Sequence, residues 1–215
     1  MRIDVRKPIL NENDRVALLN AKRLSDAKLV GVNVLASPGA GKTSLLSRVL
    51  QALPANLRSG VIEGDVASAI DTEKIRQLGF PATQINTDGG CHLSATMVAG
   101  AIETLGLTGP GFIFIENIGN LICPAEFKLG ESLRLVIANV AEGDDKPIKY
   151  PAVFASADVV VLNKIDLVEH VEFRQQFFET GLRAVNPDAP LLPISCRTGQ
   201  GVQALVDWLV SAARF

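Results

Sequence analysis

The sequence predicts an α/β protein whose mostly parallel sheet has about seven strands, with helices on both faces. Short β-branched runs alternate along the chain with longer amphipathic stretches, and the unusual polar residues follow the short runs. This alternation is typical of parallel sheets, because each parallel pair of strands needs a crossover connection. The expected strands cover residues 29–35, 60–62, 82–85, 112–115, 134–140, 158–162 and 191–194.

Apolar residues at helical spacing predict the helices that connect these strands. The three clearest stripes are Leu45, Leu46, Val49, Leu50 and Leu53; then Phe173, Phe177, Phe178 and Leu182; then Val202, Leu205, Val206 and Leu209. Residues 11–28 predict a further helix ahead of the first strand. We therefore expect an N-terminal helical extension over residues 1–28 and one domain over residues 29–215.

The composition of the chain excludes several classes of protein. The 215 residues include 21 Lys+Arg and 23 Asp+Glu, for a net charge of −2, and 47% are hydrophobic. This apolar content excludes a disordered chain, and the lack of a basic surplus argues against a nucleic-acid partner. The apolar runs are far shorter than the roughly 20 residues of a membrane span. With no secretory signal and an odd number of cysteines, we expect a cytoplasmic protein without a membrane partner.

A glycine-rich turn follows the first expected strand and reads Ala36-Ser-Pro-Gly-Ala-Gly-Lys-Thr-Ser44. Small residues let backbone N–H groups surround a phosphate, and the N-terminus of the next helix favours negative charge. The pattern indicates a P-loop NTPase in which Lys42 reaches the β- and γ-phosphates and the Thr43 hydroxyl ligates Mg²⁺. The formal pattern begins with glycine, whereas this chain has Ala36 at that position. Alanine is allowed there if its φ is negative. The expected phosphate-binding residues are Pro38, Gly39, Ala40, Gly41, Lys42, Thr43 and Ser44.

Asn163-Lys-Ile-Asp166 follows the sixth expected strand and indicates guanine rather than adenine. The Asp166 carboxylate can accept hydrogen bonds from N1–H and the 2-amino group of guanine, a donor pair that adenine lacks. Asn163 can bond N7 of the base, and the Lys164 stem can lie over it. Ser195 and Cys196, after the last strand, fit a final base-contacting loop. The alternative is a surface turn, and the position downstream of a phosphate loop favours base binding.

Two further strand ends are acidic, at Glu63-Gly-Asp65 and Glu116-Asn-Ile-Gly119. We expect Asp65 to coordinate Mg²⁺, directly or through water, and to orient the attacking water. Glu116 takes the place of a Walker-B carboxylate, and Gly119 offers a backbone N–H to the γ-phosphate. The predicted catalytic set is Asp65, Lys42 and Glu116, and the predicted Mg²⁺ ligands are Thr43, Asp65 and Glu116. Alternatively, these acidic residues cap helices or have their carboxylates hydrogen bonded within loops. No catalytic arginine is obvious, so we expect slow intrinsic turnover.

Cys91, His92 and Cys123 form a candidate second metal site. Thiolate and imidazole are suited to Zn²⁺ or Ni²⁺. Three ligands do not close a tetrahedral site, so the site is either open or completed by a symmetric partner chain. The alternative is that the cysteines are buried and inert and that His92 is an ordinary loop residue. The two glycines before Cys91 favour an exposed loop.

Taken in order, these motifs resemble the HypB family, GTPases that help to insert nickel into [NiFe]-hydrogenase. The resemblance extends from about Leu29 to the end of the chain. It is carried by Ser37–Thr43, Glu63–Asp65, Cys91–Leu93, Glu116–Pro124, Glu142–Pro151 and Asn163–Asp166.

The resemblance implies a SIMIBI-class P-loop fold, with the G domain over residues 29–215, and hydrolysis of GTP to GDP and phosphate. It also implies a homodimer that forms on GTP or metal binding, with a nucleotide-coupled nickel or zinc site of Cys91, His92 and Cys123 at the dimer interface. The implied partners are the small nickel chaperone HypA and, indirectly, the hydrogenase large subunit. No cysteine precedes Cys91, and His92 and His170 are the only histidines, so the Cys-rich or His-rich nickel motifs of some members are not expected.

Two other interpretations remain open. One is a urease-type nickel-insertion GTPase, although the Cys-Pro-His motif typical of that family is absent. The other is a metal-regulated GTP-binding module with negligible hydrolysis. A small-molecule kinase is disfavoured, because it would not need the guanine-binding pattern of Asn163–Asp166. The charged segment 142–151 is either a solvated cluster or, as we prefer, a contact with a partner.

Overall fold

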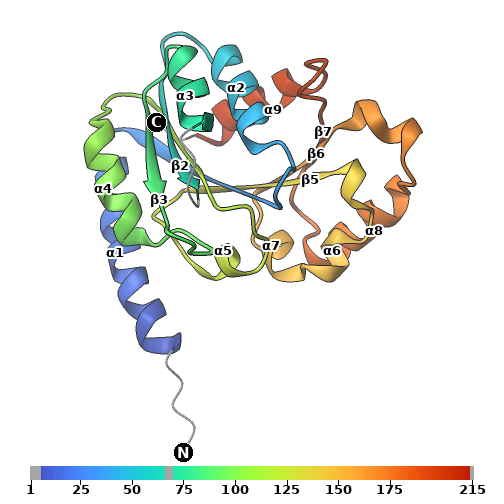
Figure 1. Ribbon diagram of the computed structural model, residues 1–215, viewed down its shortest axis with the longest axis horizontal. Coiled ribbons are helices and arrows are strands. Elements are labelled where there is room, and N and C mark those ends of the chain that lie inside the picture. The colour runs from blue at the N-terminus through green and yellow to red at the C-terminus, as the bar shows by residue number, and fades with distance from the viewer. Residues whose placement is uncertain (1–5, 66–69, 214–215) are drawn as a thin grey trace, which may run out of the picture.

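The computed structural model describes residues 6–65 and 70–213, and its centre is a seven-stranded parallel sheet (Figure 1). The strands follow the order β3-β2-β4-β1-β5-β6-β7, and every neighbouring pair is parallel. The predicted α/β class is therefore confirmed. The strands are β1 (Leu29–Ala36), β2 (Arg58–Asp65), β3 (Ala82–Asn86), β4 (Gly111–Glu116), β5 (Leu133–Asn139), β6 (Val159–Asn163) and β7 (Leu191–Pro193).

Helices cover both faces of the sheet (Figure 1). One face carries α2 (Lys42–Ala52), α3 (Ile70–Gln77) and α9 (Val202–Ala212); the other carries α1 (Arg6–Asp26), α4 (Ala95–Leu105), α7 (Pro151–Ala155) and α8 (Gln175–Val185). The short helices are α5 (Cys123–Glu126), α6 (Lys146–Lys149), η1 (Val140–Glu142) and η2 (Ile165–His170). In the described part of the chain, no helix has both the length and the apolar content needed to cross a membrane.

The central strands are buried on both faces because helices pack on each. In β4, Phe112 and Phe114 join the core beneath α2 and α9, whereas Ile113 and Ile115 join the core beneath α1 and α4. Successive side chains of a strand point to opposite faces, so a strand covered on both sides is apolar throughout. This is why the strands are continuous apolar runs in the sequence.

One predicted apolar stripe is only partly buried. Phe178 and Leu182 of α8 lie in the core, but Phe177 is 38% exposed, and Phe173 precedes the helix. The Arg174 guanidinium lies over the Phe177 ring, 4.5 Å from its centroid. Adjacent residues of a helix point about 100° apart, so the core accommodates Phe178 and leaves its neighbour at the surface.

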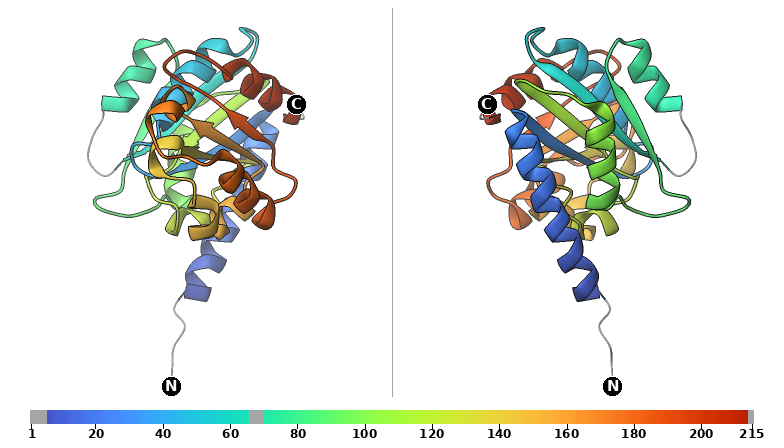
Figure 2. Two further views of the ribbon diagram at one scale, coloured as in Figure 1. Left: turned by 90° about the vertical axis from the view of Figure 1, so that its right-hand side faces the viewer. Right: turned by 90° about the vertical axis from the view of Figure 1, so that its left-hand side faces the viewer.

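The helix expected over residues 11–28 is α1, which runs from Arg6 to Asp26 beside α4 (Figure 2). Two buried asparagines of α1 bind backbone groups on two other segments. Asn13 Nδ2 donates to Lys128 O and Asn13 Oδ1 accepts from Ala95 N, both at 2.8 Å. Asn20 Nδ2 donates to Ala95 O (2.8 Å) and Leu129 O (2.9 Å). α1 therefore joins the start of α4 to the loop before β5.

Replacing Asn20 with alanine is expected to lower the free energy of unfolding by about 1–3 kcal/mol, because two carbonyls lose a buried donor. Denaturant unfolding measures this change. The matched control is Leu19→Ala on the same helix, where the side chain is 55% exposed, with an expected change of about 0.5 kcal/mol or less. Equal effects of the two substitutions would contradict a structural role for the Asn20 amide.

Candidate nucleotide and metal site

The glycine-rich turn forms a loop between the end of β1 and the start of α2. Gly39 and Gly41 have φ values of +74° and +97°, which favour glycine, and Gly41 caps α2. Ala36 ends β1 with a negative φ and is completely buried. Alanine therefore fits this position without strain, and the departure from the formal pattern leaves the loop geometry intact.

The segment predicted to bind the base packs directly on this loop. Asn163 Nδ2 donates to Ala40 O (2.9 Å), and Lys164 Nζ donates to Gly39 O (2.7 Å). A Cβ at Gly41 would lie 2.5 Å from Asn163 Nδ2, so this close approach requires glycine. Asn163 Oδ1 also accepts from Lys164 N and, at 3.3 Å, from Cys196 N. One asparagine thus joins both predicted base loops to the phosphate loop.

A cavity of about 340 Å³ opens between these loops. Its lining residues are Gly41, Ser44, Asn163, Lys164, Asp166, Leu167, Cys196 and Arg197. Asp166 Oδ1 accepts from the Ser195 hydroxyl at 2.6 Å, and this hydrogen bond lowers the pKa of Asp166. The carboxylate is therefore charged and held in one orientation, as an acceptor for two base donors needs to be.

Glu116 lies beside the phosphate loop, where its carboxyl group is buried. Thr43 Oγ1 donates to Glu116 Oε1 at 2.9 Å, while the buried Oε2 has no hydrogen-bond partner. Burial raises the pKa of Glu116 to about 7, and the Lys42 charge opposes this shift. A buried, unpartnered carboxylate oxygen beside a threonine hydroxyl fits a hard cation such as Mg²⁺. Asp65 ends β2, the strand next to β4.

The loop after Glu116 also touches the phosphate loop. A Cβ at Gly119 would lie 3.0 Å from the Cα and N atoms of Pro38, so the two backbones pass in close contact. Glu63 pairs with Glu116 in the β2–β4 register and accepts a hydrogen bond from Thr72. Burial raises the pKa of Glu63 as well.

Glu142 also lies at this site, although no motif in the sequence assigned it a role. It accepts hydrogen bonds from the Ser37 hydroxyl of the phosphate loop and from Asn139 Nδ2. The rest of the charged segment is bound within the chain, since Asp144 pairs with Arg174 at 2.7 Å and Lys149 with Asp145 at 2.6 Å. The position of Glu142 just after a strand was the signal that could have identified it.

The three predicted nickel or zinc ligands lie on two neighbouring segments. Cys91 is exposed, its Sγ lies 3.5 Å from His92 Nδ1, and a hydrogen bond with the Cys123 thiol raises the pKa of Cys91. The His92 ring stacks on Phe127 with 3.8 Å between centroids, and burial lowers the pKa of His92. The structure thus places Cys91 against His92, and the segments of Cys91 and Cys123 side by side. Within residues 6–65 and 70–213, however, no group of three His, Cys, Asp or Glu side chains is arranged to hold a metal ion.

Metal-free and nucleotide-free protein is expected to lose stability as the pH rises from about 4.5 to about 7. Over this range the folded state keeps the Glu116 proton and the unfolded state releases it, so the free energy of unfolding falls by on the order of 3 kcal/mol. Denaturant unfolding at a series of pH values measures the slope. Glu116→Gln retains an oxygen that accepts from Thr43 and should reduce the slope, leaving the part due to Glu63. An unchanged slope would contradict this assignment.

Comparison with known proteins agrees with the motifs. Residues 31–193 match the family model described as CobW/HypB/UreG, nucleotide-binding domain. The hydrogenase maturation factor HypB of Rhizobium leguminosarum bv. viciae is 46% identical over 99% of this chain and 71% of its own length. The hydrogenase/urease maturation factor HypB of Helicobacter pylori is 33% identical over 99% of this chain and 88% of its own. A crystal structure of HypB from Helicobacter pylori in complex with nickel has a TM-score of 0.90 at 33% identity, covering 94% of this chain and 95% of that one. This chain therefore belongs to the HypB family.

Proposed function

We propose that this protein is a GTP-hydrolysing metallochaperone that delivers nickel during [NiFe]-hydrogenase maturation, with its nickel affinity set by the bound nucleotide. The observation that carries the proposal is that Cys91 Sγ lies 3.5 Å from His92 Nδ1 on a segment that touches the one carrying Cys123. The two segments meet where Asn120 donates to Cys91 O and where the His92 ring stacks on Phe127. Family membership and the nickel complex of a relative support it.

The nucleotide is held in two parts. Backbone N–H groups of residues 39–44 and the Lys42 ammonium bind the phosphates, and the cavity bounded by Asp166 and Cys196 receives guanine. Lys164, held by its bond to Gly39 O, keeps its stem along this cavity. The base and phosphate subsites are therefore fixed relative to each other before GTP binds.

Hydrolysis needs positioning and charge neutralisation more than covalent chemistry. Thr43, Asp65 and Glu116 would hold Mg²⁺, which neutralises phosphate charge when bound. In this proposal Asp65 orients the attacking water, Gly119 offers its N–H to the γ-phosphate, and Lys42 stabilises charge on the transferring oxygens. With no arginine assigned to the transition state, turnover is slow, on the order of unassisted GTPases.

The nickel or zinc site is completed between two copies of the chain. One copy contributes Cys91, His92 and Cys123, and a second copy related by a two-fold axis supplies the remaining ligands. The exposure of Cys91 supports this arrangement, because a ligand shared between subunits must reach the surface. The proposed partners are the nickel chaperone HypA and, indirectly, the hydrogenase large subunit.

Delivery to urease is a second candidate, because the name of the Helicobacter pylori relative includes urease. The Cys-His-Leu sequence at residues 91–93 differs from the Cys-Pro-His motif typical of urease GTPases, which favours hydrogenase. Nickel transfer to each apo-enzyme, measured side by side, distinguishes the two.

Asp166→Asn is expected to weaken GTP binding by about 100-fold or more and to improve xanthosine triphosphate binding, because the amide offers a donor to the 2-oxo group of xanthine. Calorimetric titration with both nucleotides measures the change. Asp207→Asn, on the surface of α9, is the matched control and should bind GTP normally. Unchanged nucleotide preference in Asp166→Asn would rule out base recognition by this carboxylate.

Nickel affinity is expected to differ by about fivefold or more between protein loaded with GDP and protein loaded with a non-hydrolysable GTP analogue. Cys91→Ala and Cys123→Ala should abolish this binding, while Cys196→Ala, in the base loop, should retain it. Light scattering during the titration should report a mass of two chains. Equal affinities in the two nucleotide states, or nickel binding that survives both substitutions, would leave a GTPase without the metal-coupled mechanism.

A further inference from the structure

Asn117 and Asn33 are completely buried, on segments that lead to or follow residues of the candidate nucleotide site. Asn117 directly follows Glu116, whose carboxylate accepts from Thr43 of the phosphate loop. Asn33 lies in β1, which leads into the same loop. Buried amides that are fully hydrogen bonded fix the geometry of the segments they join, because a broken bond there is not replaced by water.

The first connection runs from Asn117 to the segment that carries Cys91 and His92. Asn117 Oδ1 accepts from Ile118 N at 2.9 Å and from Leu93 N at 3.3 Å. Leu93 is completely buried and follows His92. A change in the position of the Glu116–Gly119 loop therefore acts directly on the backbone beside a predicted nickel ligand.

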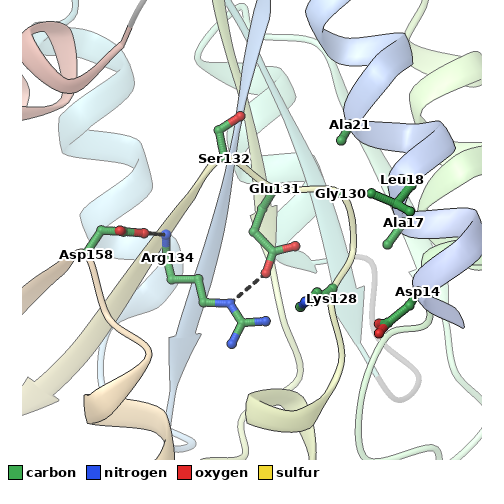
Figure 3. A pocket seen from close by; sticks show the side chains of 10 residues that line it. All are labelled: Asp14, Ala17, Leu18, Ala21, Lys128, Gly130, Glu131, Ser132, Arg134 and Asp158. Carbon is green, nitrogen blue, oxygen red and sulfur yellow. Dashed lines mark hydrogen bonds and ion pairs between the residues drawn. The ribbon is translucent and has the colours of Figure 1, made fainter. Parts of the chain in front are cut away.

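The second connection runs from Asn117 through Asn33 to the loop before β5. Asn117 Nδ2 donates to Asn33 Oδ1 at 3.2 Å, and Asn33 Nδ2 donates to Glu131 Oε1 at 3.3 Å. The same Glu131 oxygen accepts from Arg134 Nε at 2.7 Å (Figure 3). These four side chains form a continuous chain of hydrogen bonds from the edge of the nucleotide site to the amino end of the sheet.

Arg134 carries this connection to the segment after Cys123. Its guanidinium donates to Ala125 O at 3.1 Å and to Phe127 O at 3.2 Å. Ala125 lies in α5, the short helix that begins at Cys123, and the Phe127 ring stacks on His92. The segment of Cys91 and His92 is therefore hydrogen bonded directly to Asn117 through Leu93 N. The segment that begins at Cys123 is connected to Asn33 indirectly, through Arg134 and Glu131.

We propose that Asn117, supported by Asn33, is the positioning residue that couples the bound nucleotide to nickel affinity. This inference rests on the proposed function, because it names the side chains through which the nucleotide acts on the nickel ligands. The two segments also meet where Asn120 Nδ2 donates to Cys91 O at 3.2 Å. In the described residues, however, Asn120 has no hydrogen bond to β1, so Asn117 makes the connection to β1, the strand that leads into the phosphate loop.

The experiment compares full-length wild-type protein with Asn117→Ala, Asn33→Val and Asn186→Ala. Asn186 is the matched control, a buried asparagine that donates to Phe154 O and Ala157 O in the core beneath α7 and α8. Ni²⁺ is titrated against a chromophoric chelator with GDP or with a GTP analogue bound. The readout is the ratio of the two nickel dissociation constants, which a general loss of stability does not change.

We expect a wild-type ratio that departs from one by about fivefold or more, retained in Asn186→Ala and reduced below about twofold in Asn117→Ala and Asn33→Val. Affinity for the GTP analogue should stay within about threefold in all variants. A cooperative thermal transition establishes that each variant folds, and Asn33→Val decides the question if Asn117→Ala does not fold.

A wild-type ratio in either folded variant of the Asn117–Asn33 pair would overturn this assignment while leaving the proposed function in place. A reduced ratio in Asn186→Ala would overturn it as well, because the effect would not depend on the connection. A wild-type ratio of one would instead overturn the nucleotide coupling in the proposed function, and this inference with it.

Discussion

The backbone of the phosphate loop is held by side chains from the carboxyl ends of other strands. When the loop turns its N–H groups inward, its carbonyls face outward and need donors, which Asn163 provides for Ala40 O and Lys164 for Gly39 O. A buried carbonyl without a partner costs about 1–3 kcal/mol, so the bond from Asn163 to the buried Ala40 O is needed for the loop to keep its shape. Glu142 holds the start of the loop through Ser37. The loops predicted to bind the phosphates and the base therefore form one unit, and the cavity between them has defined walls.

Unlike the phosphate loop, whose carbonyls are paired with donors, the acidic part of the site is electrostatically unfavourable in the free protein. Glu63 and Glu116 lie on neighbouring strands, both are buried, and burial raises the pKa of each. Two carboxyl groups this close together in a buried position are unfavourable as anions, and a cation with a nucleotide relieves that cost. The free protein thus keeps a region whose electrostatics improve on binding, which links the protonation of Glu116 to occupancy of the site.

The segments with Cys91 and Cys123 combine an exposed edge with a buried support. Cys91 faces solvent, while buried amides hold the backbone behind it: Asn117 binds Leu93 N, and Asn13 and Asn20 of α1 bind the start of α4 and the loop before β5. Ligands for a shared metal site need both accessibility and a fixed backbone. The N-terminal helix contributes to that fixed backbone although its sequence carries no motif.

The parallel sheet and the two loops predicted to bind nucleotide could be identified from the sequence alone, because each depends on local patterns: strand–helix alternation, glycines in a short turn, and polar residues just after apolar strands. Which side chains join these parts is visible only in the folded structure. The bonds from Asn117 to Leu93, from Asn33 to Glu131 and from Glu142 to Ser37 connect residues far apart in the chain. An isolated asparagine or glutamate has no local signature of its partner, since that partner is set by how strands and helices pack.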